Sequence, residues 1–223
     1  MFYRGLKQAR GIALLALGVG SFLALGFAAE TPPQISTLVK PAILKKVKED
    51  REVVAFARLE TLKDELKRYS LYSSMQVKAG LPKTYRILTD YRLYPKMVPY
   101  VEKADYDEKT HILLVEGGIW KFKVISSVHF QEISDRWIRY EIVAGHFKGL
   151  KGNIYFEPAS EKGTLVYIHG EQEGTHWPPQ WIIERGAEIV FGFTAKRMRT
   201  YIETEAPGAA QNDTEVPKPR THL

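Results

Sequence analysis

The sequence predicts an α+β fold: a curved antiparallel sheet of six to seven strands, two short helices after the first strand, and one long C-terminal helix. Three observations predict it. In several segments between Tyr69 and Thr175, apolar and polar residues alternate with a period of two, as in strands with one covered face. The stretch 178–205 instead has helical periodicity. A length of 223 residues, 44% of them hydrophobic, supports one sizeable core with appendages.

The N-terminal segment 1–28 has the features of a signal peptide. An apolar run over residues 11–29 follows a basic start and ends in small residues, Gly26 and Ala28, which suit cleavage after Ala28. The run also reaches the roughly 18 apolar residues that span a bilayer, so an uncleaved membrane anchor is the alternative. Either arrangement places the rest of the chain outside the cytoplasm, and we expect a periplasmic or secreted protein. The basic residues of the start are Arg4, Lys7 and Arg10.

Charge and cysteine content exclude several classes of function. The formal net charge is +6, and it falls to +3 without residues 1–28, which contain three basic and no acidic residues. This mild, scattered excess is no footprint for nucleic acid, so we expect no nucleic-acid partner. The chain has no cysteine, which excludes disulfides, thiolate metal sites and cysteine nucleophiles.

The region before the main domain is expected to be a linker and a short helix, over residues 29–50. Two prolines within residues 30–40 disfavour regular structure there, and residues 41–50 can form a helix. Residues 52–60 favour a strand, with a helix as the alternative. The main domain is then expected over residues 51–205, and the polar, proline-containing tail 206–223 is expected to be disordered.

The first alternating strand, residues 69–78, precedes two short helices. Residues 81–90 form the first, because Pro82 suits an initial helical turn. Residues 91–99 form a second helical turn that Pro99 ends.

A run of antiparallel strands follows, over residues 111–116, 119–133, 137–144, 152–157 and 164–175. Gly117 and Gly118 are expected to form a turn or bulge between the first two. One face of each strand is apolar and the other is polar, which predicts a sheet covered on one side. The inward residues include Trp120, Phe122, Val124, Val128, Phe130, Ile138, Tyr140, Ile142, Ile154, Phe156, Val166 and Ile168.

One long helix over residues 178–205 is expected to cover that sheet, starting at Pro178 and Pro179. Steps of 100° place charged residues on one side of this helix. The opposite side contains Ile183, Gly186, Ala187, Val190, Thr194 and Tyr201, flanked by Phe191, Phe193 and Met198.

Residues 77–99, 145–158 and 163–167 carry motifs that resemble those of the START-like (SRPBCC) superfamily, the Bet v 1-like helix-grip proteins, and within it the polyketide cyclase and coenzyme Q-binding branch. Residues 77–99 are similar to the family's first strand and its "V/L-x-D-x-x-x-Y-P" helix pair. Residues 145–158 resemble "G-D-F-K-G-L-x-G-x-W-x-L-x-P", except that His146 replaces Asp and Ile154 replaces Trp. Residues 163–167 resemble "G-T-x-V-x-Y". The similarity spans residues 70–204.

The resemblance implies a cavity between the sheet and the C-terminal helix that binds a hydrophobic small molecule such as a lipid, quinone, sterol or polyketide. The residues of this chain support a cavity, because the small side chains of the helix would face large aromatic side chains of the strands and leave space between them. The small residues are Gly186, Ala187, Val190 and Thr194. An empty apolar void costs ~20–30 cal/mol per Å³, which a ligand would recover. The alternative is that Phe191, Phe193 and Met198 fill the space.

The ligand-binding residues that we expect are Trp120, Phe122, Val124, Ile138, Tyr140, Ile142, Phe147, Ile154, Phe156, Val166, Ile168, Ile183, Ala187, Val190, Thr194 and Arg197. Tyr140, Thr194, Tyr201 and Arg197 are the polar groups that could orient a head group. Trp177 and Trp181, beside prolines, would lie at the cavity mouth and could make transient membrane contact or form a hydrophobic staple.

No catalytic or metal-binding set is recognisable, and we expect no cofactor. The six histidines include no pair at metal-ligand spacing, and no nucleophile elbow, P-loop or dinucleotide fingerprint occurs. The predicted function is therefore non-catalytic binding of a hydrophobic molecule. Two alternatives stay open: a cyclase or aromatase that uses Tyr140 or His146 for proton transfer, and a protein-interaction module with a patch around Tyr155 and Tyr167 on the outer sheet face.

Overall fold

A computed structural model describes residues 30–119, 122–160, 162–175 and 180–205. The predicted signal peptide, the predicted tail, Trp120 and Trp177 lie outside the described residues. So do the side chains of residues 119, 122, 181–184 and 187–188. The helices are α1 (Ile35–Leu38), α2 (Pro41–Lys48), α3 (Leu81–Thr89), the 3₁₀ turn η1 (Tyr91–Leu93), α4 (Tyr94–Met97) and α5 (Gln180–Thr204). The strands are β1 (Val54–Thr61), β2 (Lys67–Val77), β3 (Val101–Asp107), β4 (Ile112–Ile119), β5 (Phe122–Ser134), β6 (Trp137–Gly145), β7 (Lys151–Ser160) and β8 (Gly163–Gly174).

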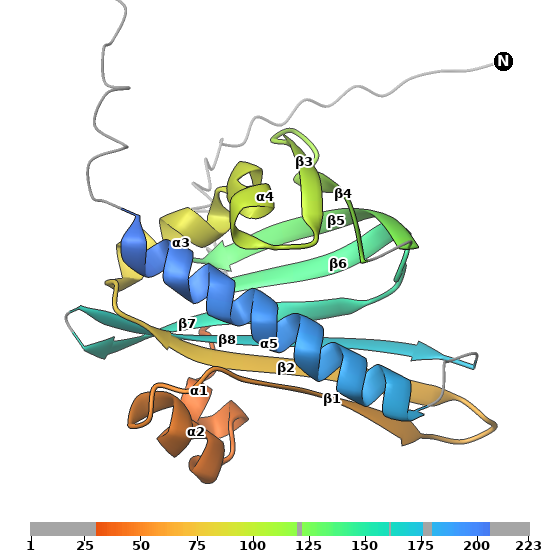
Figure 1. Ribbon diagram of the computed structural model, residues 1–223, viewed down its shortest axis with the longest axis horizontal. Coiled ribbons are helices and arrows are strands. Elements are labelled where there is room, and N and C mark those ends of the chain that lie inside the picture. Colours follow the sequence, from red (N-terminus) through yellow and green to blue (C-terminus); the bar gives the residue numbers. More distant parts are fainter. Residues whose placement is uncertain (1–29, 120–121, 161, 176–179, 206–223) are drawn as a thin grey trace, which may run out of the picture. The chain divides into compact units, whose positions relative to one another are not determined.

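The eight strands form one curved antiparallel sheet in the order β1-β2-β8-β7-β6-β5-β4-β3 (Figure 1). The predicted α+β class, the two short helical segments after β2 and the long C-terminal helix are confirmed. The strand count is one higher than predicted, because β3 was missed. Four of the seven residues of β3 are charged, and it pairs only with β4, so it is a polar edge strand without strong alternation.

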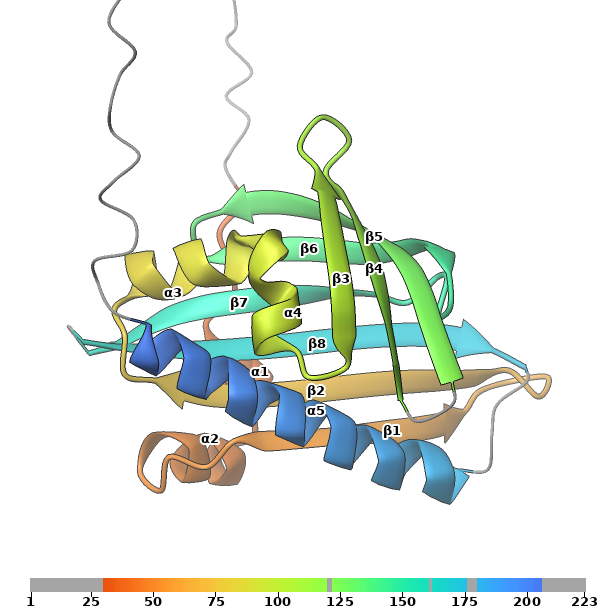
Figure 2. The same ribbon diagram turned by 45° about the horizontal axis from the view of Figure 1, so that its top comes forward.

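Helix α5 runs along β1 and β2 on the concave face of the sheet (Figures 1 and 2). Of the α5 side chains that the structure describes, Ala195, Met198 and Ile202 are buried. The predicted stripe of Val190, Thr194 and Tyr201 is only half-buried, and Phe193 is 52% exposed. The prediction used only the periodicity of the helix. Because α5 packs over the edge pair β1–β2, a neighbouring face of the helix is buried.

The short helices α3, η1 and α4 close one end of the concave face. Tyr91 of η1 is buried, and its ring stacks on Phe130 of β5 with centroids 4.2 Å apart. Tyr106 of β3 packs beside it at 4.6 Å. This aromatic cluster joins the helical corner to the strands at the far edge of the sheet.

Helices α1 and α2 pack on the convex face, opposite α5. Ile35, Val39 and Val47 are buried there against Tyr155 and Tyr167, which alternate with the concave-face residues of β7 and β8. The backbone N–H of Ile35 also donates to Glu157 Oε2 at 2.8 Å. The expectation of a free linker over residues 30–40 is therefore wrong for the part after the prolines. Apolar residues at the α1–α2 segment give it a face to bury.

Gly117 does not form a turn, because β4 continues through it to Ile119. The alternative of a bulge is closer, since the β3–β4 register shifts between Val101 and Lys103, opposite Gly117. A Cβ at this position would lie 1.9 Å from the carbonyl oxygen of Tyr100. Glycine is needed here for the close approach of the backbone that leads into β3. Within the part of the chain that the structure describes, no helix is both long enough and apolar enough to cross a membrane.

Candidate functional site

The concave face has a packed half, where side chains from α3, η1, α4 and the C-terminal part of α5 cover the sheet. Ile138, Ile154, Phe156 and Val166, all expected ligand contacts, are between 0% and 8% exposed there. They contact a cluster that includes Met75, Val77, Ile87, Leu88, Tyr91, Met97, Met198 and Ile202. These four residues therefore belong to the hydrophobic core of this state of the protein.

A second buried cluster, made of Ala57, Leu59, Tyr69, Leu71 and Leu150, packs against Tyr140, Ile142 and Phe191. Beside these two clusters lies an open half, where inward-facing residues keep part of their surface accessible. It comprises Val124, Tyr140, Ile142 and Ile168 of the sheet, with Val190 and Thr194 of α5, all half-buried. The four strand residues point to the concave face, because their neighbours along each strand point to the convex face. Their accessible surface therefore lies on the side of the sheet where α5 packs. Inward apolar groups that remain accessible are the surface that a hydrophobic ligand would cover.

Tyr140 is a polar group of the open half, and Gly170 makes room for its hydroxyl, while Gly152 allows the close approach of the His169 backbone. The Tyr140 hydroxyl donates to the carbonyl oxygen of His169 at 3.2 Å. A Cβ on Gly170 would lie 2.5 Å from that hydroxyl, and one on Gly152 would lie 1.9 Å from the His169 oxygen. Burial raises the pKa of Tyr140 above its ordinary value, so the hydroxyl remains a neutral donor. Gly170 is therefore a small residue of the sheet that shapes the site, in addition to the small helix residues that we expected.

Tyr91 carries a second inward hydroxyl, and it was not among the residues expected at the site. The residue is 1% exposed, and among the described residues its hydroxyl oxygen has no hydrogen-bond partner. Burial raises its pKa strongly. The signal in the sequence was the Tyr91–Tyr94 spacing in the short helical segment, which puts both rings on one side of a turn.

Two expected ligand contacts lie at the surface. Phe147, in the loop between β6 and β7, is 56% exposed and has a φ of 61°. Arg197 is exposed, and its Nε donates to the carbonyl oxygen of Lys96 in α4 at 3.4 Å. Arg197 therefore joins α5 to α4, and no described contact directs it to the open half. The remaining expected contacts, Trp120, Phe122, Ile183 and Ala187, lie with their side chains outside the described residues, as does the side chain of Trp181.

The groups proposed for proton transfer are engaged in structural contacts. His146 is exposed, and its Nδ1 lies 3.1 Å from both the N–H and the carbonyl oxygen of Ile125. The backbone oxygen of His146 accepts a hydrogen bond from Ser126 at 2.7 Å. Tyr140 donates to a backbone carbonyl, as described above. In the described ranges, no group of three or more potential ligand residues could hold a metal ion.

The patch proposed for a protein partner is occupied by the chain itself. Tyr155 and Tyr167 are 9% and 6% exposed, because α1 and α2 cover them. An interaction surface centred on these two residues is therefore wrong.

Comparison with known proteins identifies the fold. The sequence matches no protein-family model, and no curated protein matches it. Solved structures do. A START superfamily protein from Mycobacterium smegmatis matches with a TM-score of 0.52 and 14% identity over 60% of this chain and 97% of that one. A conserved protein from Geobacillus kaustophilus matches with a TM-score of 0.52 and 12% identity over 60% of this chain and 94% of that one.

A third similar structure is the two-domain ARO/CYC protein BexL from the BE-7585A biosynthetic pathway. It has a TM-score of 0.51 and 13% identity, and the match covers 60% of this chain and 46% of that one. At such identities the likeness shows the architecture, and the site of this chain has to be argued from its own residues.

Proposed function

Because this chain has the START/SRPBCC-like helix-grip fold, we propose that it is a non-catalytic binding protein for a hydrophobic small molecule, a lipid, a quinone or a similar compound. The ligand lies between the sheet and α5. The observation that supports this proposal is the open half, where Ile142, Ile168 and Val190 face inward and stay partly accessible.

The chemistry of the open half suits an uncharged or weakly polar ligand. Burial of each CH₂ group contributes about 0.8 kcal/mol, so an acyl or isoprenoid chain gains several kcal/mol on such a surface. Among the described residues, the open half offers the neutral hydroxyls of Tyr140 and Thr194, whereas the Arg197 guanidinium donates to the backbone carbonyl of Lys96. A carbonyl or hydroxyl head group fits these partners better than a multiply charged one.

The proposal includes export. A basic start followed by an apolar run and small residues at Gly26 and Ala28 supports a leader, or an anchor that faces the periplasm. Trp177 and Trp181 would then contact the membrane transiently during ligand exchange, because indole rings favour the interface.

The test is native mass spectrometry and lipid extraction of protein purified gently from its own cell envelope, with two variants on α5. Val190→Trp fills the open half from a half-buried position. Ile189→Trp, at 61% exposure, adds the same bulk to the solvent face of the helix and is the matched control.

We expect a co-purifying hydrophobe in the wild type and in Ile189→Trp, and its loss in Val190→Trp with the thermal unfolding temperature preserved. Repeated recovery of empty wild-type protein, with no thermal shift against a panel of lipids and quinones, would end the proposal. Equal ligand content in the two variants would place the ligand elsewhere.

A further inference from the structure

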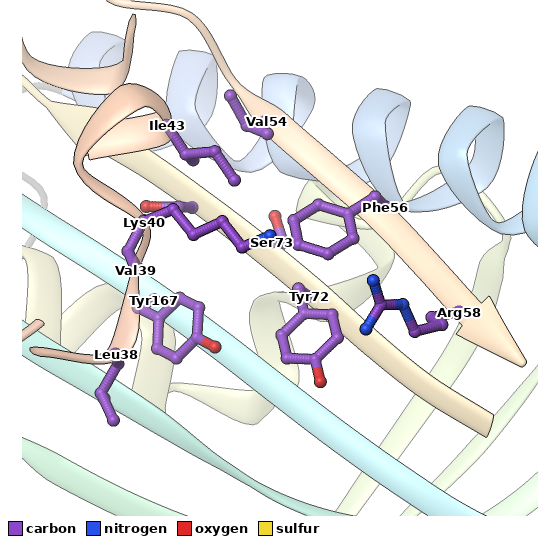
Figure 3. A pocket seen from close by; sticks show the side chains of 11 residues that line it. Leu38, Val39, Lys40, Ile43, Val54, Phe56, Arg58, Tyr72, Ser73 and Tyr167 are labelled. Carbon is purple, nitrogen blue, oxygen red and sulfur yellow. The ribbon is translucent and has the colours of Figure 1, made fainter. Parts of the chain in front are cut away.

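The convex face carries a groove of about 360 Å³, on the opposite side of the sheet from the open half. It lies between the α1–α2 connection and strands β1, β2 and β8 (Figure 3). Three of the elements around it, α1, α2 and β1, precede the strand β2 with which the helix-grip order of this chain starts. The groove therefore belongs to an N-terminal addition to that order, and its function is independent of the proposed concave site.

The floor of the groove is made of two neighbouring cross-strand rows. One row contains Ser74 and Tyr167. In the other, Phe56 and Tyr72 stack with ring centroids 4.8 Å apart and planes 21° apart. His169 continues this second row, with its ring 4.9 Å from that of Tyr72. Flat, stacked rings offer a planar apolar surface, which suits another aromatic ring better than a flexible chain.

A buried polar atom in this groove lacks a partner. Ser74 lines the groove and is 4% exposed, and its hydroxyl oxygen has no hydrogen-bond partner in the described part of the chain. Buried hydroxyls are normally paired, so this one indicates an acceptor or donor that a bound molecule would supply. The hydroxyl of Tyr167 lies in the same row, and burial raises its pKa, which keeps it a neutral donor.

Two cationic side chains border the floor. Figure 3 shows Lys40, from the α1–α2 connection, and Arg58, from β1, both directed toward the aromatic rings. Arg58 also pairs with Glu60 at 3.0 Å, so part of its charge is compensated. Lys40 is exposed on the rim and has no ion pair within 4.0 Å among the described residues. The groove therefore combines an aromatic floor with a positively charged edge.

We propose that this convex groove is a second binding site, for an aromatic carboxylate. The ring of the ligand lies on Phe56 and Tyr72, its carboxylate lies toward Lys40 and Arg58, and a polar substituent pairs with the Ser74 hydroxyl. The volume is at the low end of the 300–1,000 Å³ range typical of small-molecule sites, so the ligand has one or two rings. The positive charge of Lys40 at the rim and the buried unpaired hydroxyl of Ser74 favour this occupant over an uncharged lipid, which would offer no anion to Lys40 and no partner to Ser74.

The probe is 2-naphthoate, titrated into the full chain by calorimetry and by two-dimensional NMR. Lys40→Glu reverses the charge of an exposed groove residue, and Lys48→Glu makes the same change on the same helical segment outside the groove. Ile43→Trp blocks the groove from its half-buried side wall. Neutral 2-naphthalenemethanol and vesicles of phosphatidylcholine with phosphatidylglycerol complete the set.

We expect Lys40→Glu to weaken 2-naphthoate binding at least about tenfold and Lys48→Glu to leave it within about twofold. Ile43→Trp abolishes binding, whereas Val190→Trp in the open half leaves it unchanged. NMR shifts move in β1, β2 and the α1–α2 connection. The neutral alcohol binds more weakly, and Lys40→Glu does not change its affinity.

Several results would overturn the assignment. These are undetectable binding of 2-naphthoate to the wild type, equal weakening by Lys40→Glu and Lys48→Glu, or NMR shifts confined to β5, β6 and α5. Co-sedimentation with the anionic vesicles that Lys40→Glu abolishes would also overturn it, because the groove would then contact a lipid surface rather than a free anion.

Discussion

The unpartnered hydroxyl of Tyr91 makes a sharp prediction about stability. The residue is 1% exposed, and its hydroxyl lacks a hydrogen bond among the described residues, whereas its ring stacks on Phe130 at 4.2 Å. A buried unpaired hydroxyl costs about 1–3 kcal/mol, and phenylalanine keeps the stacking. Tyr91→Phe should therefore raise the free energy of unfolding by about 1 kcal/mol or more, which corresponds to roughly 2–4 °C in the midpoint of thermal unfolding.

Tyr94→Phe is the matched control, three residues along the same helical segment. Its hydroxyl donates to the carbonyl oxygen of Leu88 at 3.3 Å, so removing it should lower the free energy of unfolding by about 0.5–1.5 kcal/mol. Urea unfolding of delipidated protein, followed by circular dichroism, measures both changes. Opposite signs are expected. A loss of stability in Tyr91→Phe as large as that in Tyr94→Phe would refute the reasoning, since the hydroxyl would then be paired.

Three further predictions concern the sheet. Ile138→Ala should lower the free energy of unfolding in urea by about 2–5 kcal/mol, because the side chain is 0% exposed. Ile125→Ala, at 46% exposure, should change it by no more than about 0.5 kcal/mol. Equal effects would contradict the packed half. Gly152→Ala should cost at least about 3 kcal/mol or prevent folding, because the new Cβ would lie 1.9 Å from the His169 oxygen; unchanged thermal stability would refute that close approach. Burial lowers the pKa of His169 below its ordinary value of 6.5. Below that pH His169 binds a proton in the unfolded chain more readily than in the folded chain, so the free energy of unfolding falls as the pH drops from about 6.5. His169→Gln should reduce this decline between about pH 6.5 and 5.5. An identical pH profile in the variant and the wild type would exclude the effect.

The alternation of apolar and polar residues was sufficient to predict most of the sheet. In β6, Ile138, Tyr140 and Ile142 face the concave side as expected, because a strand has a strict period of two. The same rule could not find β3, since an edge strand with charges at Glu102, Lys103, Asp105 and Asp107 buries too little surface to alternate.

Tertiary placement decided the features that the sequence could not predict. The face of α5 that is buried depends on where the helix lies on the sheet, and packing over β1 and β2 turned Phe193 to the solvent. The roles of Gly152 and Gly170 depend on which strands are neighbours. A Cβ on Gly152 would meet the His169 backbone of β8, and a Cβ on Gly170 would meet the Tyr140 hydroxyl from β6. Likewise, the sequence did not predict that Ile35 and Val39 are buried, because their contacts Tyr155 and Tyr167 are distant in the chain.

The most direct test of the binding proposal is an NMR measurement of contacts between a bound lipophile and labelled methyl groups of the protein. With a short-chain quinone or a medium-chain fatty acid as the probe, we predict intermolecular Overhauser effects to the methyl groups of Ile142, Ile168 and Val190. Effects confined to Ile43 and Val54 on the convex face, or no effects at saturating probe, would contradict a ligand between the sheet and α5.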